Sequence, residues 1–230
     1  MSITKSLIIP CKDEGPNFLN IYNGFKEKIS KNTEIIIVLD SDKDITFPAI
    51  NTKLDDNSRI LFSNTVGPAA AVKYGIENSN GQMVCIAMGD GSDDPNQVEE
   101  LFSLLEYGAD IAVGSRYSKG GKYDGKKNLK WFLSRSAGFV LYHFFRIGTK
   151  DPTNMFKAYS KEFLKEVNIE SNNGFTLGLE MIVKGKLNNK KIKEIPTIWT
   201  DRTFGESKFN LKKFIPSYVY WVRRLLFIKE

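Results

Sequence analysis

The chain has 230 residues, which is enough for one large α/β domain with a buried core. Its 41% hydrophobic and 26% charged residues are those of a folded globular protein, and the sequence contains no low-complexity tract, internal repeat or linker. The formal charge of +6 and the pI of about 9.1 favour an anionic partner over a cationic one.

In the first 115 residues, short apolar runs rich in Ile, Val and Leu alternate with helix-like segments, and such runs are typical of strands buried on both faces. The expected strands are Ser6–Pro10, Glu34–Leu39, Arg59–Phe62, Met83–Met88 and Ile111–Val113, and the expected helices are Phe18–Lys28, Pro68–Asn78 and Asn96–Tyr107. The alternation predicts an α/β fold with a doubly wound, mostly parallel sheet and helices on both faces. In such sheets, ligands bind at the carboxyl ends of the strands.

After residue 121 the alternation ends. The elements expected there are helix Lys130–Phe145, strand Asn154–Tyr159, helix Phe175–Lys184, edge strand Lys193–Trp199, broken at Pro196, and helix Leu211–Ile228, interrupted early at Pro216. No linker divides the chain, so we expect a single domain over residues 1–209, followed by a basic amphipathic helix within residues 210–230.

Charge is distributed unevenly along the chain. Residues 116–135 contain seven basic residues and one acid, and residues 184–213 contain nine basic residues and three acids. The acids that look placed for chemistry lie in the first hundred positions. A half that carries carboxylates and a half that is basic together suggest a metal ion and an anion in one site.

The segment Met88–Pro95 directly follows an expected buried strand, so its carboxylates emerge at the ligand edge. Its aspartates, Asp90, Asp93 and Asp94, repel one another and are best tolerated around a cation. Mg²⁺ or Mn²⁺, bound by one or two carboxylates and by substrate phosphates, fits this chemistry. The same acids would also cap the helix that starts near Pro95, and the two roles are compatible.

A second acidic loop, Asp40–Asp44, follows the second expected strand. An acid at this place commonly accepts hydrogen bonds from a nucleoside, although a turn rich in Asp and Ser is equally compatible with these residues. No G-x-G-x-x-G fingerprint follows the first strand and no P-loop occurs in the chain. The sequence therefore argues against a dinucleotide-binding or P-loop NTPase fold.

Several short motifs are shared with one known family. They are Pro10–Glu14, Asp40–Asp44, Gly67–Gly75, Met88–Pro95, Gly114–Tyr117, Leu133–Arg135, Asp151–Tyr159 and Arg202–Lys208. In this order they resemble the family 2 glycosyltransferases of GT-A fold, which are nucleotide-diphospho-sugar transferases. The resemblance runs from about Ser6 to Lys208 and is strongest to the dolichol-phosphate mannosyltransferase branch and its bacterial polyprenyl-phosphate relatives.

The resemblance implies a nucleoside pocket at the first strand ends. Pro10, Glu14 and Asp40 would line it, and we group Asp42 and Gly67 with them.

The resemblance also implies that Asp90 and Asp93 serve the metal ion and the diphosphate, with Asp94 close by. The usual aspartate-x-aspartate motif is replaced by Gly89-Asp90-Gly91, which leaves the alignment of the individual acids open by one residue. A lysine, Lys157, stands where arginine is commoner, and the two side chains are not equivalent as phosphate clamps.

On the basic side, Arg116 and Arg135 resemble arginines that grip the acceptor phosphate, because forked guanidinium groups suit phosphate geometry. Arg202 and Lys208 resemble a loop that closes over the diphosphate, with Gly205 as its hinge, and excludes water. The alternative for all of these cations is a solvated surface role.

A hydroxyl acceptor needs a general base, whereas a phosphate acceptor is already ionised at neutral pH. The sole histidine, His143, lies in an aromatic run and is expected to be a core or interfacial residue. The residues therefore favour inverting transfer of a hexose from a nucleoside-diphosphate sugar, of the GDP-mannose or UDP-glucose type, to a polyprenyl (dolichol-type) phosphate.

Two alternatives stay open. Transfer to a saccharide hydroxyl in surface polysaccharide synthesis would make Asp94 the leading candidate base. A catalytically silent protein that binds nucleotide-sugar or lipid phosphate would account for the departures at Gly89–Gly91 and Lys157. Nucleic acid is the least favoured partner, because no known reading module is present.

The location of the protein is also suggested by the sequence. The two cysteines are expected to be buried and reduced, residues 1–10 carry no signal-peptide pattern, and no apolar stretch reaches the ~18–20 residues that span a bilayer. The terminal helix, with Trp221 among its apolar residues, could lie in an anionic membrane surface, pack on the core or form a dimer contact. We expect a cytoplasmic protein, peripheral on the cytosolic face of the inner or plasma membrane, with a possible membrane-protein partner.

Overall fold

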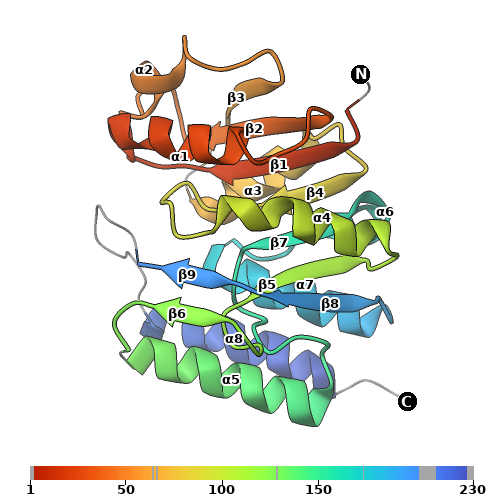
Figure 1. The fold of residues 1–230 in the computed structure, drawn as a ribbon. Coiled ribbons are helices and arrows are strands. Elements are labelled where there is room, and N and C mark those ends of the chain that lie inside the picture. The colour runs from red at the N-terminus through yellow and green to blue at the C-terminus, as the bar shows by residue number, and fades with distance from the viewer. Residues whose placement is uncertain are drawn as a thin grey trace.

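The computed structural model describes residues 3–63, 65, 67–127, 129–172, 174–201 and 211–226. Within these residues a seven-stranded sheet runs through the molecule in the order β3-β2-β1-β4-β7-β5-β8 (Figure 1). Its strands are β1 Lys5–Pro10, β2 Thr33–Leu39, β3 Ser58–Phe62, β4 Met83–Ile86, β5 Ile111–Ser115, β7 Lys157–Ser160 and β8 Ile192–Pro196. Strand β7 runs antiparallel to its neighbours β4 and β5, and the other pairs are parallel.

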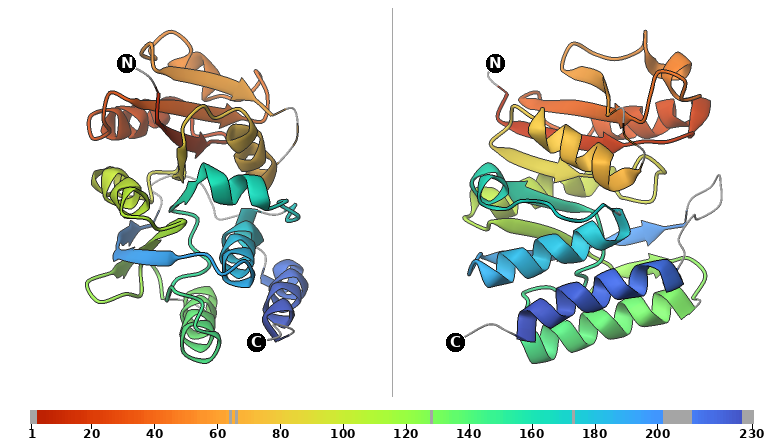
Figure 2. Two further views of the ribbon diagram at one scale, coloured as in Figure 1. Left: turned by 90° about the vertical axis from the view of Figure 1, so that its right-hand side faces the viewer. Right: turned by 180° about the vertical axis from the view of Figure 1, so that it is seen from behind.

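Helices cover both faces of this sheet (Figure 2). They are α1 Phe18–Lys26 and α4 Val98–Glu106 on one face, and α3 Pro68–Glu77, α7 Gly174–Leu187 and α8 Leu211–Leu226 on the other. Successive strand residues point to opposite faces. Accordingly, Ile8 and Ile36 belong to the core under α3 and α7, whereas Leu7 and Ile35 belong to the core under α1 and α4. The predicted doubly wound, mostly parallel sheet is confirmed.

A small second sheet lies beside the end of the large one. Strand β9 Ile198–Thr200 pairs in parallel with β6 Lys122–Asp124. The expected edge strand over Lys193–Trp199 is broken at Pro196, as predicted: β8 lies at the edge of the large sheet, and after Pro196 the chain passes to β9 of the second sheet, with Thr197 bonded to both Ser115 and Lys122. Helix α5 Leu129–Phe145 runs below this small sheet in Figure 1.

The short elements escaped prediction. They are the 3₁₀ turns η1 Gly15–Asn17 and η2 Pro95–Gln97 and the helices α2 Phe47–Ile50 and α6 Lys161–Glu166. Each has one turn or two and carries too few apolar residues to show a period.

The terminal helix α8 packs on α7. Trp221 and Leu225 are buried there, so the core-packing role expected as one alternative is present. The helix continues through Pro216, where an interruption was expected. The division of the chain at residue 209 stays a prediction. Among the described residues, no helix has the length and hydropathy that crossing a bilayer requires.

Candidate active site

The loops singled out by the sequence share one edge of the sheet. Strands β1, β2, β4 and β5 are related by parallel pairing or by the shared neighbour β7, so their carboxyl ends face the same way. The antiparallel strand β7 begins at this edge with Lys157, whose register partners are Ile86 of β4 and Val113 of β5. Lys157 thus lies between the loop that follows β4 and the loop that follows β5.

Some of the residues expected to line the nucleoside pocket come together at the ends of β1, β2 and β3. Asp40, after β2, accepts a 2.5 Å hydrogen bond from Lys12 Nζ and a longer one, 3.4 Å, from the backbone N–H of Gly67. Gly67 is the N-cap residue directly before α3. Its φ of 117° is a backbone conformation that glycine adopts without steric cost. Asp42 is exposed on the turn.

The loop after β1 is held by Asp44, which the sequence showed only as part of the acidic loop Asp40–Asp44, and by Thr46, which it did not single out. The buried carboxylate of Asp44 accepts the backbone N–H groups of Asp13 and Thr46. The buried hydroxyl of Thr46 accepts those of Glu14 and Gly15. These bonds fix Glu14, a predicted nucleoside residue, against the end of β2. The sequence pattern that could have indicated this arrangement is an Asp two residues before a Thr, which is typical of a turn in which the Asp side chain accepts a backbone N–H.

The loop after β4 carries the expected metal ligands. Asp93 is 4% exposed, and its Oδ2 accepts the backbone N–H of Met88 at 2.8 Å. The pKa of Asp93 is raised to about 7, chiefly because burial disfavours the carboxylate; the charge of Asp90 acts in the same direction, whereas the hydrogen bond from Met88 and the charges of Arg116 and Lys157 oppose it. Asp90 Oδ1 accepts the N–H of Ser92. Asp94 caps the 3₁₀ turn η2 through the N–H of Asn96, so the predicted capping role belongs to this aspartate.

Two glycines flank Asp90, and the first of them leaves no room for a side chain. A Cβ at Gly89 would lie 2.9 Å from the carbonyl oxygen of Pro10 and 3.1 Å from Cβ of Cys11. Gly91 has a φ of 74°. At position 89 a larger residue requires a shift of neighbouring backbone atoms, and the carboxylates of this loop are those of Asp90 and Asp93.

A cavity of about 300 Å³ lies between this loop and α1. Asp90 and Asp93 line it together with Asp201, which follows β9 and was not predicted. Among the described residues, no three His, Cys, Asp or Glu side chains form a ready metal cage. Two carboxylates beside an open cavity fit Mg²⁺ or Mn²⁺, because these ions are commonly held by one or two carboxylates and completed by substrate phosphates. Asp93, whose carboxylate form is disfavoured by burial, would be stabilised by such a cation.

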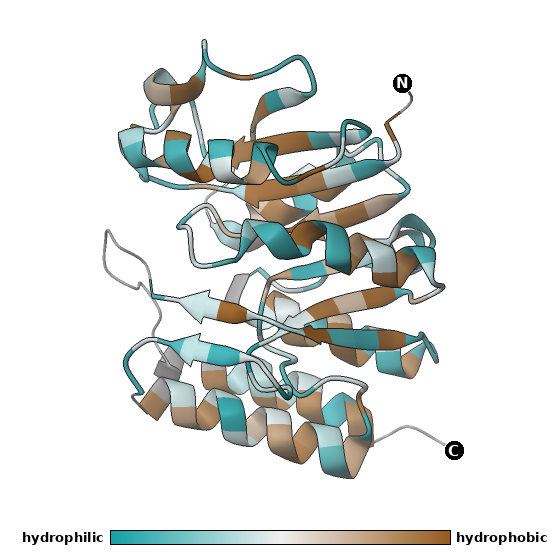
Figure 3. Ribbon diagram, viewed as in Figure 1, coloured by the Kyte–Doolittle hydropathy of each residue, from teal (hydrophilic) through white to brown (hydrophobic). Residues whose placement is uncertain are grey.

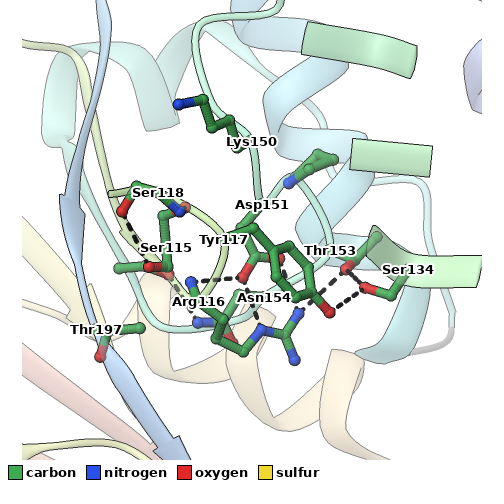
Figure 4. A network of polar contacts seen from close by, with 12 residues as sticks. Ser115, Arg116, Tyr117, Ser118, Ser134, Lys150, Asp151, Thr153, Asn154 and Thr197 are labelled. Atoms are coloured by element: carbon green, nitrogen blue, oxygen red, sulfur yellow. Dashed lines mark hydrogen bonds and ion pairs between the residues drawn. The ribbon is translucent and has the colours of Figure 1, made fainter. Parts of the chain in front are cut away.

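Arg116, directly after β5, is held by a residue 35 positions further on, Asp151 (Figure 4). The Nε atom donates to Asp151 Oδ2 at 2.7 Å, and Nη2 donates to Oδ1 at 2.8 Å. Asp151 is fully buried. Burial alone would raise its pKa, but the charge and hydrogen bonds of Arg116 outweigh burial and hold the pKa below its usual value.

Hydroxyl groups connect this pair to α5. Arg116 Nη2 also reaches Thr153 Oγ1 at 3.3 Å, and Thr153 Oγ1 lies 2.9 Å from Ser134 Oγ of α5. Tyr117 donates to the same Ser134 hydroxyl (Figure 4). The neighbouring Arg135 is exposed, and its guanidinium lies 5.9 Å from the ring centre of Tyr117. Arg116 is thus an internal anchor, and Arg135 is the more accessible cation.

Lys157 is fully buried beneath both loops. Its Nζ donates to the carbonyl oxygens of Pro152 and Asn154. Burial lowers its pKa to about 7; the charges of Asp151 and Asp93 raise it and that of Arg116 lowers it. Lys157 therefore supports the loop that carries Asp151 and does not clamp a phosphate in this structure.

The structure thus brings the predicted residues Asp90, Asp93 and Arg116 to one edge of the sheet. Arg202, Gly205 and Lys208 lie outside the described residues. The motif Asp151–Tyr159 was noticed in the sequence, but Asp151 was given no role, because a buried ion pair formed across 35 residues leaves no periodic pattern.

Comparison with known proteins supports a single family. Residues 6–167 match the family model described as Glycosyl transferase family 2. The chain is 29% identical over 227 residues to a dolichol-phosphate mannosyltransferase of Pyrococcus furiosus, which covers 96% of this chain and 63% of that protein. It is 27% identical over 216 residues to a polyprenol monophosphomannose synthase of Mycolicibacterium smegmatis, and this match covers 89% of this chain and 80% of that protein. The chain therefore spans less than two thirds of the length of the first relative.

Solved structures share the fold. The glucosyl-3-phosphoglycerate synthase of Mycobacterium tuberculosis, in complex with Mn²⁺, UDP and glucosyl-3-phosphoglycerate, superposes with a TM-score of 0.71 at 14% identity over 97% of this chain and 78% of that one. The same enzyme with Mg²⁺ and UDP gives a TM-score of 0.72 at 14% identity, covering 99% and 80%. Together with the family match over more than half of its residues, this likeness shows that the chain belongs to glycosyl transferase family 2 and has the GT-A fold.

Proposed function

We propose that this chain is an inverting glycosyltransferase that transfers a hexose from a nucleoside-diphosphate sugar, of the GDP-mannose or UDP-glucose type, to a polyprenyl phosphate. One observation carries the proposal. A loop of carboxylates after β4 and Arg116 after β5 flank Lys157 at the same sheet edge. The first suits a cation with a diphosphate, and the second suits an anionic acceptor.

The donor would lie over the ends of β1, β2 and β4. Glu14 and Asp40 would accept hydrogen bonds from the nucleoside, as acids at strand ends of doubly wound sheets do. Asp90 and Asp93 would hold Mg²⁺ or Mn²⁺ beside the diphosphate. The bound cation would neutralise charge that develops on the leaving diphosphate. The solved relatives that carry Mn²⁺ or Mg²⁺ together with UDP support this arrangement.

The acceptor would lie on the side of β5 and α5. One of the two curated relatives is named a dolichol-phosphate mannosyltransferase, and the other is named a polyprenol monophosphomannose synthase. A phosphate monoester is ionised at neutral pH, so its oxygen needs no base. His143 is exposed on α5 beside Phe139, so the core position expected as one alternative is wrong, and the interfacial alternative stays open.

The reaction is a single displacement. A phosphate oxygen of the acceptor attacks the anomeric carbon from the face opposite the diphosphate. The new C–O bond forms as the bond to the diphosphate breaks, the nucleoside diphosphate leaves with the electron pair, and the configuration inverts. Arg135 would orient the attacking phosphate, and Arg116 would contribute positive charge from the protein interior.

A lipid acceptor calls for contact with a membrane. Helices α5 and α8 lie side by side at one end of the molecule (Figures 1 and 2), and Figure 3 shows brown segments along α5. Exposed apolar residues on these helices are Leu129, Phe132, Leu133, Phe139, Val140, Phe144, Ile215, Val219, Tyr220 and Leu226. Exposed cations, among them Lys126, Lys127 and Arg223, flank them. Apolar and basic residues together suit an anionic membrane surface, which would be its cytosolic face.

The test is donor and acceptor turnover by the purified chain. GDP-mannose and UDP-glucose are each incubated with Mg²⁺, Mn²⁺ or EDTA and a short-chain polyprenyl phosphate, and the product is identified by mass spectrometry. Metal-dependent glycosyl phosphate formation, lost in Asp90→Ala, is expected. Transfer to a saccharide hydroxyl with no transfer to polyprenyl phosphate would overturn the acceptor, and nucleotide binding without turnover of any donor would overturn the activity.

A further inference from the structure

We propose that Asp151 is a positioning residue for the acceptor: it fixes the direction of Arg116 and, through the hydrogen bonds of Arg116 to Thr153 and of Thr153 to Ser134, the place of Ser134 and its neighbour Arg135 on α5. The inference rests on the proposed polyprenyl-phosphate transfer, because the acceptor is taken to meet these side chains. Asp151 itself is fully buried and is not placed in contact with substrate.

The Asp151 carboxylate binds both the backbone N–H and the guanidinium group of Arg116. Oδ2 accepts the backbone N–H of Arg116 at 3.0 Å and its Nε at 2.7 Å, and Oδ1 accepts Nη2 at 2.8 Å. A pair that holds the main chain and the guanidinium fork at once leaves the side chain little freedom. The guanidinium stays charged, since the charge of Asp151 outweighs burial and raises the pKa of Arg116 above its usual value.

The loop that carries Asp151 is itself rigid. Glu194 of β8 accepts the hydroxyl of Thr149 and the N–H of Lys150, both at 2.8 Å, and Thr149 accepts the N–H of Asp151 at 3.0 Å. From the other side, Lys157 donates to the carbonyl of Pro152 at 3.2 Å. The carboxylate therefore sits on a support that does not depend on substrate.

The same loop sets the position of α5. A Cβ at Gly138 would clash with the carbonyl oxygen of Lys150, so the helix backbone lies directly against the loop. One turn earlier, Ser134 is bonded to Thr153, which also accepts from Arg116. Arg135 follows Ser134 on the helix. Hydrogen bonds thus connect Asp151, through Arg116 and Thr153, to Ser134 of α5 (Figure 4), which is next to Arg135 in the chain.

The experiment compares Asp151→Asn with a matched control, Glu34→Gln. Glu34 is also a buried carboxylate that pairs with an arginine, Arg59, and accepts a backbone N–H, but it lies at the amino end of β2. For Asp151→Asn we expect the KM for a short-chain polyprenyl phosphate to rise about tenfold or more, equivalent to about 1.4 kcal/mol. The Kd for the nucleoside diphosphate with Mg²⁺ should stay within about twofold. Glu34→Gln should lower the melting temperature but leave both constants within about twofold.

A double-mutant cycle tests whether Asp151 acts through Arg116. Arg116→Lys keeps the charge but loses the fork, and adding Asp151→Asn to it should raise the KM by less than about threefold further. Multiplicative losses in the double variant, or an unchanged acceptor KM in Asp151→Asn, would overturn the inference. If the wild type transfers nothing to polyprenyl phosphate, the proposed function fails first. If the wild type is active and Asp151→Asn matches it, only the positioning role fails.

Discussion

Gly89 lies against the carbonyl oxygen of Pro10, so closely that a Cβ at position 89 would come within 2.9 Å of it. The end of β1 and the loop after β4 are therefore in contact through backbone atoms. This contact favours glycine at position 89, and the acids of the loop stand at Asp90 and Asp93.

The first prediction places an aspartate at position 89. Gly89→Asp should lower the free energy of unfolding by about 1–3 kcal/mol, because the new side chain overpacks against Pro10 and Cys11. It should also weaken Mg²⁺-dependent nucleotide binding, since the loop must move. Urea denaturation and calorimetric titration with GDP and UDP measure the two effects. A variant with tighter metal-dependent binding and unchanged stability would contradict the steric account.

The second prediction concerns Thr46, whose buried hydroxyl accepts the N–H groups of Glu14 and Gly15 at 3.0 and 3.2 Å. Thr46→Val leaves both groups without this acceptor, which should cost about 1–3 kcal/mol of unfolding free energy. Because the loop of Glu14 is then released, the Kd for the nucleoside diphosphate should rise about tenfold.

A control for Thr46→Val is available at the opposite end of the sheet. Thr33 is buried at the start of β2, and its hydroxyl lies 3.1 Å from that of Ser30. Thr33→Val should reduce stability without changing the nucleotide Kd. Equal loss of nucleotide affinity in both variants would mean that Thr46 acts only through global stability.

Much of the fold, and less of the site, could be read from the sequence. The buried parallel strands show as unbroken apolar runs, and a carboxylate loop after β4 shows as a cluster of acids. Asp151 and Thr46 do not show, because their partners lie 35 and 32 positions away and only folding brings them together. Lys157 was given less weight as a phosphate clamp because arginine is commoner at its position, and its burial at the start of the antiparallel strand β7 did not show in the sequence.

The third prediction concerns the pH dependence that Lys157 causes. Burial lowers its pKa to about 7, while the unfolded chain keeps the ordinary value of 10.5; Asp151, Asp93 and Arg116 are the charges that face it. The unfolded chain therefore binds the extra proton between these values. The penalty for burying this lysine is largest below pH 7 and falls as the pH rises toward 10.5, by at most about 1.4 kcal/mol per pH unit.

Measured against Lys157→Met, the wild type should gain relative stability between pH 7 and pH 9. Urea denaturation of both proteins at several pH values in this range gives the difference, in which the contributions of distant groups cancel. A difference that does not change with pH would show that Lys157 keeps its proton throughout the range.

The last prediction tests the membrane face formed by α5 and α8. Phe139 and Phe144 are 60% and 76% exposed on α5, so replacing them with serine should change the unfolding free energy little. If the rings enter a lipid surface, losing both should weaken binding to anionic vesicles about tenfold or more, since burying one such ring contributes about 1.5–3 kcal/mol. The matched control is Tyr107→Ser, which removes an 82% exposed aromatic ring beyond the end of α4. Cosedimentation with phosphatidylglycerol vesicles at low salt measures both variants. Binding that survives loss of the two phenylalanines, or that falls equally in the control, would remove α5 from the membrane contact and leave lipid access to other parts of the chain.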